Sequence, residues 1–410
     1  MEKKGSIGLK RKVVAVGICI VVLLMMTASF LSRPAVVAAQ QKAGTLKIGY
    51  LLCLSDWYSV FDTIEERYLK AAAKMVNEKG GVTVQGQKYN IELVGEDGKS
   101  TMDGVTAAAT KLAYDHKVKF VIGPSAFFCV GSSPVFEEAK VLHVNAYYVA
   151  QPGELDASTP YGFLGYNASI GNTMTAIKGM RKEYPNAKKI VIVTPDDGAV
   201  PFLIPKVKKM LEISGCTVVG DTIKFPNQME DFSPIAVKIN AVKDADAVLI
   251  IHGAPAAFGL ITKGLRALGN EKPIVINAIT SLAEISAICG QAAANNILTV
   301  AMTPLAEGNP PLIDEIYKTA GSKPPIQVNC AADLWVLTRI IQAANSLDPA
   351  VVKAKWESMS TVDTLFGKGI IGGDETYGIK HHTVSHPMPY QRLVKGKGVF
   401  GGWMDVGAIP

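Results

Sequence analysis

Short apolar runs alternate with amphipathic segments along most of the chain. The run 46–52 predicts a buried strand, and the segment 63–79 then repeats apolar residues at helical spacing and ends at Gly80-Gly81. The alternation continues with predicted strands at 89–94, 120–122, 189–193, 217–223, 247–251 and 273–276, and with predicted helices at 101–116, 170–184, 201–214 and 256–268. Strands that alternate with helices favour an α/β fold, in which helices cover both faces of parallel sheets.

The pattern begins again after Pro160, which indicates two α/β units in tandem. Beyond residue 301 the chain is predicted to be helical at 312–319, 331–344 and 351–359, and it ends in β-like segments at 390–394 and 399–403. Without its leader the chain has about 370 residues, which exceeds what one hydrophobic core usually supports. Two domains are therefore expected.

The N-terminus has the three-part layout of a secretion signal. Five basic residues within the first twelve positions precede an uncharged run over residues 13–31, which Pro34 and the small residues 35–39 follow. We predict a cleavable signal peptide at residues 1–39, with the cut before Gln40, and hence a periplasmic or extracellular protein. The apolar run approaches the roughly 20 residues that span a bilayer, so an uncleaved membrane anchor is the alternative.

The charge of the chain comes mostly from this leader. Residues 1–39 contain six basic residues and one acidic residue, so cleavage lowers the formal net charge from +6 to about +1. The remaining Lys and Arg residues are scattered among acids and form no stripe. This distribution argues against nucleic acid as a partner.

Five cysteines remain after the predicted cleavage: Cys53, Cys129, Cys216, Cys289 and Cys330. Their odd number and wide spacing exclude a disulfide framework and a zinc knuckle. Cys53 and Cys129 both follow predicted strands, so one bridge between them is considered. Buried free thiols are the favoured interpretation.

Several short motifs occur in a characteristic order. They are Lys47-Ile48-Gly49, Val76-Asn77-Glu78-Lys79-Gly80-Gly81, Val94-Gly95-Glu96-Asp97, Ile122-Gly123-Pro124, Phe136-Glu137-Glu138-Ala139 and Asp231-Phe232-Ser233. In this order and spacing, the chain resembles the type I periplasmic solute-binding proteins of the leucine/isoleucine/valine-binding family. The resemblance covers nearly all of the chain after the leader.

The resemblance implies two Rossmann-like lobes with parallel sheets, joined by three hinge crossings near residues 160–166, 300–306 and 363–372. The N-terminal lobe would comprise residues 45–160 and 306–362, and the C-terminal lobe residues 161–305 and 363–410. The lobes would close on a small solute, which the protein would pass to an ABC permease and its ATPase subunits. A monomer without a cofactor is expected.

The loops after the strands differ from those of the amino-acid receptors that the chain resembles. In those receptors a Ser-containing loop after Gly-Pro holds the ligand carboxylate, whereas this loop reads Ser125-Ala126-Phe127-Phe128 and keeps one hydroxyl and the amides of a helix start. The next strand ends in Asn145-Ala146-Tyr147-Tyr148. Asn277 stands where an acid usually balances the ligand ammonium, and a buried ammonium without a carboxylate costs several kcal/mol. A free α-amino acid therefore fits poorly.

Three strand ends carry an aromatic pair each, which predicts an aromatic or apolar ligand body. The residues predicted to enclose that body are Trp57, Tyr58, Phe127, Tyr147 and Tyr148. The residues predicted to bind the polar group are Ser125, the amides of Ala126 and Phe127, His252, Asn145 and Asn277. The favoured ligand is an aromatic or apolar carboxylate, and a branched-chain or other amino acid or amide is the alternative. Each aromatic pair, and a lone strand-end histidine, can equally be packing residues.

No sequence motif supports an enzyme. G-x-S-x-G, H-E-x-x-H, G-x-x-x-x-G-K and G-x-G-x-x-G do not occur in the strand and helix context that their chemistry needs. A membrane-tethered sensory receptor is the alternative from another class. His381, His382 and His386 are close in sequence, but the flanking prolines predict an irregular surface segment rather than a metal site.

Overall fold

The computed structural model describes residues 43–125, 128–146, 152–196, 200–226, 229–301, 307–323 and 328–410. The predicted signal peptide at 1–39 lies outside these residues. None of the helices in the described ranges combines the length and the apolar character that a bilayer crossing requires.

Six strands form the first sheet, in the order β2-β3-β1-β4-β5-β6. They are β1 (Gly44–Leu52), β2 (Val82–Val84), β3 (Gln87–Asp97), β4 (Phe120–Ser125), β5 (Leu142–Ala146) and β6 (Gly162–Phe163). The neighbours from β3 to β6 run parallel, and β2 adds an antiparallel edge strand. β1 is apolar on both faces because both are covered: Ile48 and Leu52 belong to one core, and Leu51 belongs to another.

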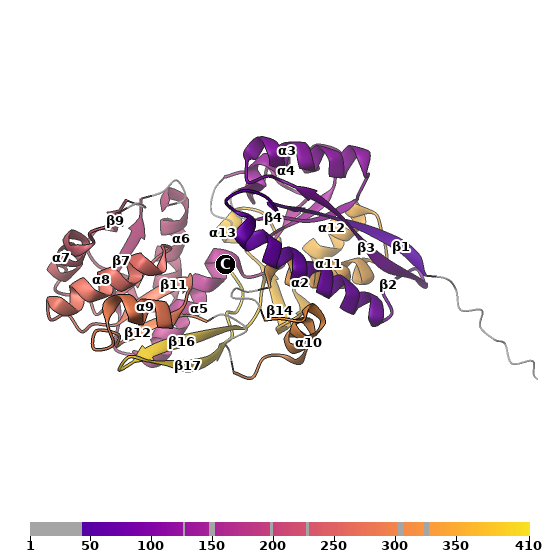
Figure 1. Cartoon of the computed structure of the whole chain (residues 1–410). Coiled ribbons are helices and arrows are strands. Elements are labelled where there is room, and N and C mark those ends of the chain that lie inside the picture. Colours follow the sequence, from indigo (N-terminus) through magenta and orange to yellow (C-terminus); the bar gives the residue numbers. More distant parts are fainter. Residues whose placement is uncertain are drawn as a thin grey trace, which may run out of the picture. The chain divides into compact units, whose positions relative to one another are not determined.

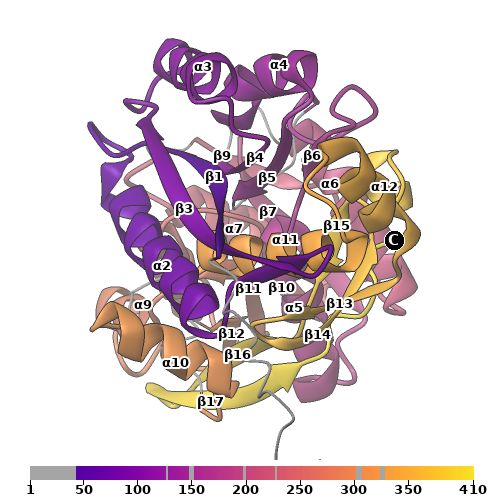
Figure 2. The same ribbon diagram turned by 90° about the vertical axis from the view of Figure 1, so that its right-hand side faces the viewer.

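Helices cover the two faces of this sheet (Figures 1 and 2). α3 (Met102–Thr110), which continues as the π-helical turn η1 (Lys111–Asp115), and α4 (Cys129–Ala139) pack on the Leu51 face. α2 (Ser59–Glu78) and α11 (Asn329–Ala344) pack on the Ile48 face, with α10 (Pro311–Ala320) and α12 (Pro349–Ser358) beside them. We call this sheet with its helices the first lobe.

The second sheet has the order β17-β16-β12-β11-β10-β7-β8, with β9 also paired to β7. Its strands are β7 (Lys189–Pro195), β8 (Thr217–Val218), β9 (Ile223–Phe225), β10 (Ala247–Ile250), β11 (Ile274–Ile279), β12 (Ile297–Val300), β16 (Met388–Val394) and β17 (Lys397–Met404). Strands β7 to β12 are parallel, whereas β16 and β17 are antiparallel additions from the C-terminus.

Helices also cover this second sheet on both faces (Figure 1). α5 (Ala168–Glu183) and α6 (Val200–Ile213) share one core with the sheet, and α7 (Ser233–Ala241), α8 (Pro255–Ala267) and α9 (Leu282–Cys289) share the other. We call this sheet with its helices the second lobe.

The segment between β6 and α5 pairs with a small third sheet, β13-β14-β15. This sheet consists of β13 (Thr361–Thr364), β14 (Gly367–Gly372) and β15 (Thr383–Ser385), with α13 (Asp374–Tyr377) before the last strand. Leu164 forms a parallel bridge with Thr383. The next residue, Gly165, lies so close to Asp333 of α11 that an added Cβ atom would be 2.8 Å from Asp333 Oδ1 and 3.0 Å from Asp333 Cα.

The prediction that the histidines near the C-terminus lie in an irregular surface segment is wrong. His382 and His386 flank β15 and are buried. The His382 ring stacks on Phe163, with the ring centroids 4.0 Å apart, and its Nε2 atom lies 2.9 Å from Glu357 Oε1. Burial lowers the pKa of His382, and it lowers the pKa of His386 to about 3. The flanking prolines suggested exposure, but these rings are part of the packing around β15.

No group of three His, Cys, Asp or Glu side chains within the described ranges is placed to hold a metal ion. The histidine His381 is only half-buried, and its Nδ1 atom lies 2.7 Å from the Glu357 carbonyl oxygen. The imidazoles of this segment therefore have separate partners within the protein.

Most predicted elements agree with the structure to within a few residues. The exceptions are the predicted strand 217–223, which is divided into β8 and β9, and the predicted helix 101–116, which ends in the turn η1. Strand β2 and helix α9 were not predicted. The five cysteines after the leader are all buried and unbonded, so the bridge considered between Cys53 and Cys129 is absent.

Replacement of Gly165 by alanine should destabilise the protein, because the new methyl group would overlap Asp333. Overpacking of this kind costs about 1–3 kcal/mol. We expect Gly165→Ala to lower the midpoint of thermal unfolding, measured by circular dichroism. Gly398→Ala is the matched control, because its methyl group would meet only Leu282 Cδ1, at 3.6 Å. Equal midpoints for the two variants would contradict tight packing at Gly165.

Candidate functional site

Loops at the carboxyl edge of the first sheet bring aromatic rings together. Trp57 and Tyr58 follow β1, and their ring centroids lie 6.1 and 5.4 Å from that of Phe128 at the start of α4. Phe61 extends the group, with its ring 5.1 Å from that of Tyr58. Trp57 is 60% exposed and Phe61 is 41% exposed, whereas Phe128 is buried beneath them. We call Trp57, Tyr58, Phe61 and Phe128 the aromatic cluster.

Hydrogen bonds from the loop after β3 hold the aromatic cluster in place. The Ser100 hydroxyl donates to the Ser55 carbonyl oxygen at 2.7 Å and accepts from the Tyr58 backbone N–H at 3.1 Å. Trp57 Nε1 donates to the Ser100 carbonyl oxygen at 3.2 Å. The Asp97 carboxylate accepts from the Ser55 hydroxyl at 2.7 Å. The exposed ring of Trp57 and the partly buried ring of Tyr58 are therefore held by a neighbouring strand end.

Asp62, in the first turn of α2, links the loops after β1 and β4. Its carboxylate is fully buried and accepts from the Cys53 backbone N–H at 2.7 Å and from the Ser125 hydroxyl at 2.8 Å. Burial disfavours the ionised form and raises the pKa of Asp62 to about 7, although the two hydrogen bonds oppose this shift. The Ser125 hydroxyl, predicted to bind the polar group of a ligand, thus donates to a carboxylate of the protein itself.

Three further acids among the described residues of the first lobe are buried: Glu65, Glu154 and Asp333. Glu65 accepts from the backbone N–H groups of Asn329 and Cys330 at the N-terminus of α11, at 3.2 and 2.9 Å. Asp333 lies one turn further along α11, and its burial and the charge of Glu65 raise its pKa well above the usual value. Together with Asp62, these groups give the first lobe an acidic interior.

A polar network lies at the carboxyl edge of the second sheet. His252 follows β10 in the left-handed region, with φ of 58°, and its backbone N–H donates to Asn277 Oδ1 at 2.8 Å. The His252 Nε2 atom lies 2.9 Å from the hydroxyl of Ser169, in the first turn of α5. Asn277 Nδ2 donates to the Thr173 hydroxyl at 3.0 Å. Two predicted site residues, His252 and Asn277, are thus joined to each other and to α5.

The other predicted site residues do not take part in these two groups. Asn145 is fully buried in β5, where its Nδ2 donates to the Glu154 carbonyl oxygen at 2.9 Å and its Oδ1 lies 3.0 Å from His143 Nδ1. Its amide is therefore used inside the first lobe. The predicted residues outside the described ranges are Ala126, Phe127, Tyr147 and Tyr148.

Three polar residues at these edges were not predicted from the sequence as site residues. Asp62 and Ser169 each stand in the first turn of a helix, and both bond to a strand end. Thr194, in β7, is fully buried, and its hydroxyl has no hydrogen-bond partner among the described residues. A polar residue that ends an apolar strand run is a signal that could have identified Thr194.

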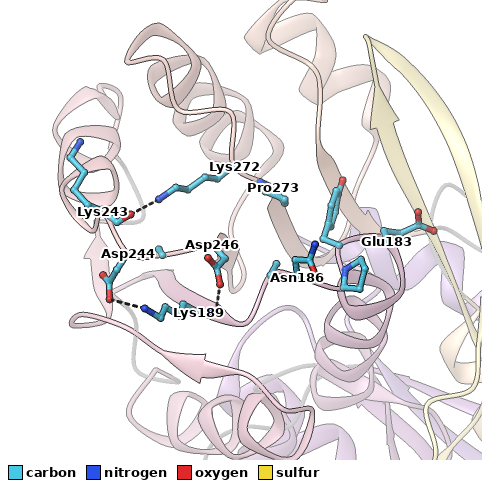
Figure 3. A pocket seen from close by; sticks show the side chains of 12 residues that line it. Glu183, Asn186, Lys189, Lys243, Asp244, Asp246, Lys272 and Pro273 are labelled. Carbon is cyan, nitrogen blue, oxygen red and sulfur yellow. Dashed lines mark hydrogen bonds and ion pairs between the residues drawn. The ribbon is translucent and has the colours of Figure 1, made fainter.

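A cavity of about 660 Å³ lies at the opposite, amino edge of the second sheet (Figure 3). Its lining comprises Glu183, Tyr184, Pro185, Asn186, Ala187, Lys189, Lys243, Asp244, Ala245, Asp246, Lys272 and Pro273. Lys272 Nζ donates to the Lys243 carbonyl oxygen at 2.9 Å, and Asp246 accepts from the backbone N–H of Lys189 at 2.8 Å. Because open parallel sheets bind ligands at the carboxyl ends of their strands, this cavity is not the candidate site.

A family model described as "periplasmic binding protein" matches residues 45–398. Among solved structures, the branched-chain amino acid binding protein LivJ of Streptococcus pneumoniae, in complex with isoleucine, is 21% identical, with 88% of this chain and 98% of that chain covered and a TM-score of 0.61. The leucine-, isoleucine-, valine-, threonine- and alanine-binding protein of Brucella ovis, in its closed conformation, is 17% identical, with 90% and 97% covered and a TM-score of 0.72.

A third similar structure has an aromatic ligand. It is the solute-binding protein of an ABC transporter from Rhodopseudomonas palustris in complex with p-hydroxybenzoic acid, at 20% identity, with 89% and 98% covered and a TM-score of 0.67. At such low sequence identities, the structural similarity is evidence for the fold alone. The prediction of a two-lobed α/β fold with parallel sheets is confirmed.

The stability of the protein should fall between about pH 4 and pH 8 through Asp62. Its pKa is raised to about 7 in the folded state from a usual value of 3.8, so the folded protein holds this proton more tightly than the unfolded chain does. Its contribution is therefore full below about pH 4 and is lost as the pH rises through about 7. Asp62→Asn should be more stable than the unchanged protein at pH 8, by on the order of 2–4 kcal/mol, and nearly equal to it at pH 4.

Urea unfolding of both proteins at a series of pH values measures this difference. Asp97→Asn is the control of opposite sign: burial opposes ionisation of Asp97, but hydrogen bonds from Ser55, Lys99 and Leu54 outweigh it and lower the pKa. That variant should be less stable than the unchanged protein at pH 8. Parallel pH profiles for Asp62→Asn and the unchanged protein would refute the raised pKa of Asp62.

Proposed function

The chain belongs to the periplasmic binding protein family and is a solute-binding receptor, and from this premise we propose that it captures an organic acid with an aromatic or apolar body. The lobes close on the solute, and the protein delivers it to an ABC permease with its ATPase subunits. The observation that carries the proposal is the aromatic cluster at the carboxyl edge of the first sheet, with Trp57 60% exposed.

The aromatic cluster supplies an apolar surface for the body of the solute. Exposed rings offer stacking and dispersion contacts, and a large apolar side chain gains about 1.5–3 kcal/mol when it is fully buried. Trp57 and Tyr58 take this role in the proposal, together with Phe127, Tyr147 and Tyr148 from the neighbouring loops. Packing within the protein does not account for the whole aromatic cluster, because the ring of Trp57, which bonds to Ser100, remains mostly exposed.

The polar group of the solute is proposed to bind at the strand ends that carry His252 and Asn277 or at the loop after β4, with Ser125 and the amides of Ala126 and Phe127. An imidazole can hydrogen-bond to a carboxylate, and it pairs with the charge when protonated. His252 and Asn277 hydrogen-bond to each other, to the Ser169 hydroxyl and to the Thr173 hydroxyl, which are all neutral groups apart from the titratable imidazole. This composition supports an anion rather than an ammonium group there.

Similar structures supply both candidate ligand classes. The protein from Rhodopseudomonas palustris holds p-hydroxybenzoic acid and belongs to an ABC transporter, which supports the aromatic acid and the transport role. LivJ of Streptococcus pneumoniae holds isoleucine, which supports the alternative of a branched-chain amino acid. The exposed tryptophan and the neutral strand end at Asn277 favour the aromatic acid.

The family is extracytoplasmic, and the signal-like residues 1–39 are proposed to export the chain and to be cleaved before Gln40. Retention of the full-length chain in membranes would instead support a tethered sensory receptor. Either form presents the same solute site.

Thermal unfolding of residues 40–410 with a panel of compounds tests the ligand class. A ligand at about 100 times its dissociation constant should add roughly 2.7 kcal/mol of stability. We expect benzoates and aryl acetates to raise the unfolding midpoint, and leucine and valine to leave it unchanged. A rise with leucine and valine alone would replace this proposal by the amino-acid alternative.

Replacement of Trp57 by alanine should weaken binding of the stabilising aryl acid by about tenfold or more, because the ring loses its stacking surface. Isothermal titration calorimetry measures this change. Tyr114→Ala is the matched control, since Tyr114 is 46% exposed in η1 and lies away from the carboxyl edge. Equal affinities for Trp57→Ala and the unchanged protein would remove the aromatic cluster from the site.

A further inference from the structure

We infer that the carboxylate of the solute binds in the second lobe, at the N-terminus of α5, where Thr194, Ser169 and His252 converge. This inference rests on the proposed function and decides between the two lobes as the place of the anion. Three features of the molecule support it: the uncapped start of α5, the unused hydroxyl of Thr194, and the buried acids of the first lobe.

Helix α5 begins without the side-chain cap that its sequence offers. Asn167 occupies the N-cap position, but its side chain makes no capping hydrogen bond. It is turned to His386 instead: Asn167 Nδ2 donates to the His386 carbonyl oxygen at 2.8 Å, and Asn167 Oδ1 accepts from the His386 backbone N–H at 2.7 Å. The first turn also contains no acidic residue. The backbone N–H groups and the positive end of this 16-residue helix are therefore not neutralised by its own side chains.

Thr194 provides an independent sign of a missing partner. Its side chain is fully buried, and its hydroxyl has no hydrogen-bond partner among the described residues. A buried hydroxyl without a partner costs about 1–3 kcal/mol, so this position is expected to serve a ligand.

The face of β7 on which Thr194 lies follows from strand alternation. Ile190 and Ile192 belong to the core that contains α5, whereas Val191 and Val193 belong to the core beneath α7 and α8. Thr194 therefore projects to the α5 side of the sheet. Its hydroxyl is directed to the same side as the start of that helix.

His252 connects the strand end to the helix start. The Ile251 backbone N–H donates to the Val193 carbonyl oxygen at 2.8 Å, which continues the parallel pairing of β10 with β7. Thr194 therefore lies opposite Ile251, the residue that precedes His252. The His252 Nε2 atom lies 2.9 Å from the Ser169 hydroxyl in the first turn of α5. When Nε2 carries the proton and donates, the Ser169 hydroxyl can donate in turn to a bound anion. The Thr194 and Ser169 hydroxyls and the helix N–H groups then form one set of donors to the anion, and the imidazole orients the Ser169 hydroxyl.

The first lobe offers the opposite environment. The Ser125 hydroxyl already donates to the Asp62 carboxyl group at 2.8 Å. Glu65 likewise accepts from the backbone N–H groups at the N-terminus of α11. An external carboxylate in the first lobe would have to compete with these two side chains for the same donors. The first lobe thus favours the apolar body, and the second lobe favours the charge.

Matched carboxylates and amides test the inference on residues 40–410. Calorimetric affinities are measured for benzoate, 4-hydroxybenzoate and phenylacetate, and for the corresponding amides. Thr194→Val removes one hydroxyl at nearly constant volume. We expect it to weaken carboxylate binding by roughly tenfold, as for loss of a hydrogen bond to a charged acceptor, and to change amide binding by less than about twofold.

Two further variants make the result specific. Thr262→Val is the matched control, because Thr262 is fully buried in α8 and donates to the Phe258 carbonyl oxygen of its own helix. It should leave both affinities unchanged. Ser125→Ala should leave the ratio of carboxylate to amide affinity unchanged if the anion lies in the second lobe.

The outcomes separate the inference from the proposed function. If Thr194→Val binds the carboxylates with the same ratio of carboxylate to amide affinity as the unchanged protein, the inference is overturned and the proposed function is not. If the ratio of carboxylate to amide affinity falls in Ser125→Ala instead, the anion is assigned to the first lobe. Binding of none of these compounds would overturn the proposed aromatic acid and the inference with it.

Discussion

The structure depends on the requirement that a parallel sheet be covered on both faces. Each parallel strand leads into a helix that packs on one face, so strand ends and helix starts meet at one edge of the sheet. In the first lobe this edge carries Trp57 and Phe128, and in the second it carries His252 and Ser169. The cavity at the amino edge of the second sheet has lysines and aspartates that bond to one another and to the backbone. The topology thus distinguishes the carboxyl edges of the sheets, where the ligand is proposed to bind, from the amino edge, where the side chains bond within the protein.

The two ligand edges differ in their electrostatic character. Among its described residues the first lobe contains four buried acids, Asp62, Glu65, Glu154 and Asp333. Two of them accept from the backbone N–H groups or the hydroxyl that would otherwise receive an anion: Asp62 from Cys53 and Ser125, and Glu65 from the start of α11. The second lobe leaves the start of α5 without its side-chain cap because Asn167 bonds to His386. The difference therefore arises because the protein's own side chains bond to the helix start in the first lobe and leave the start of α5 uncapped in the second. Under the proposed function, two lobes of similar topology would acquire distinct roles in this way.

The fold could be predicted from the sequence because its periodicities are strong. Strands such as β1 and β7 contain continuous runs of buried residues, and helix α2 repeats apolar residues at regular spacing before Gly80 and Gly81. The candidate site could be predicted only in part. His252 and Asn277 were found because they end strands, but the commitment of Ser125 to Asp62 depends on a contact across 63 positions of the chain. Local patterns carry no information about such pairs.

The burial of the C-terminal histidines could not be predicted from the local sequence either. His386 was expected at the surface because prolines flank it, yet its ring stacks on Phe366 with the centroids 4.1 Å apart. Proline restricts the backbone of its own segment, whereas burial is decided by which rings from elsewhere in the chain reach that segment. The packing of Phe366 on His386 joins β15 to the turn between β13 and β14. That contact was not visible in the order of residues.

The division of roles between the lobes bears on how a solute would drive closure. A ligand shifts a conformational equilibrium only by its difference in affinity for the two states. A solute that bound one lobe with both its ring and its charge would gain nothing further from closure. An aromatic acid whose ring lies on the aromatic cluster and whose carboxylate lies at α5 makes both contacts only when the lobes come together. A neutral aromatic compound of the same shape keeps the first contact and loses the charged part of the second, so it stabilises the closed state less. In the proposed arrangement, selectivity for the acid and closure of the lobes would therefore have the same physical origin.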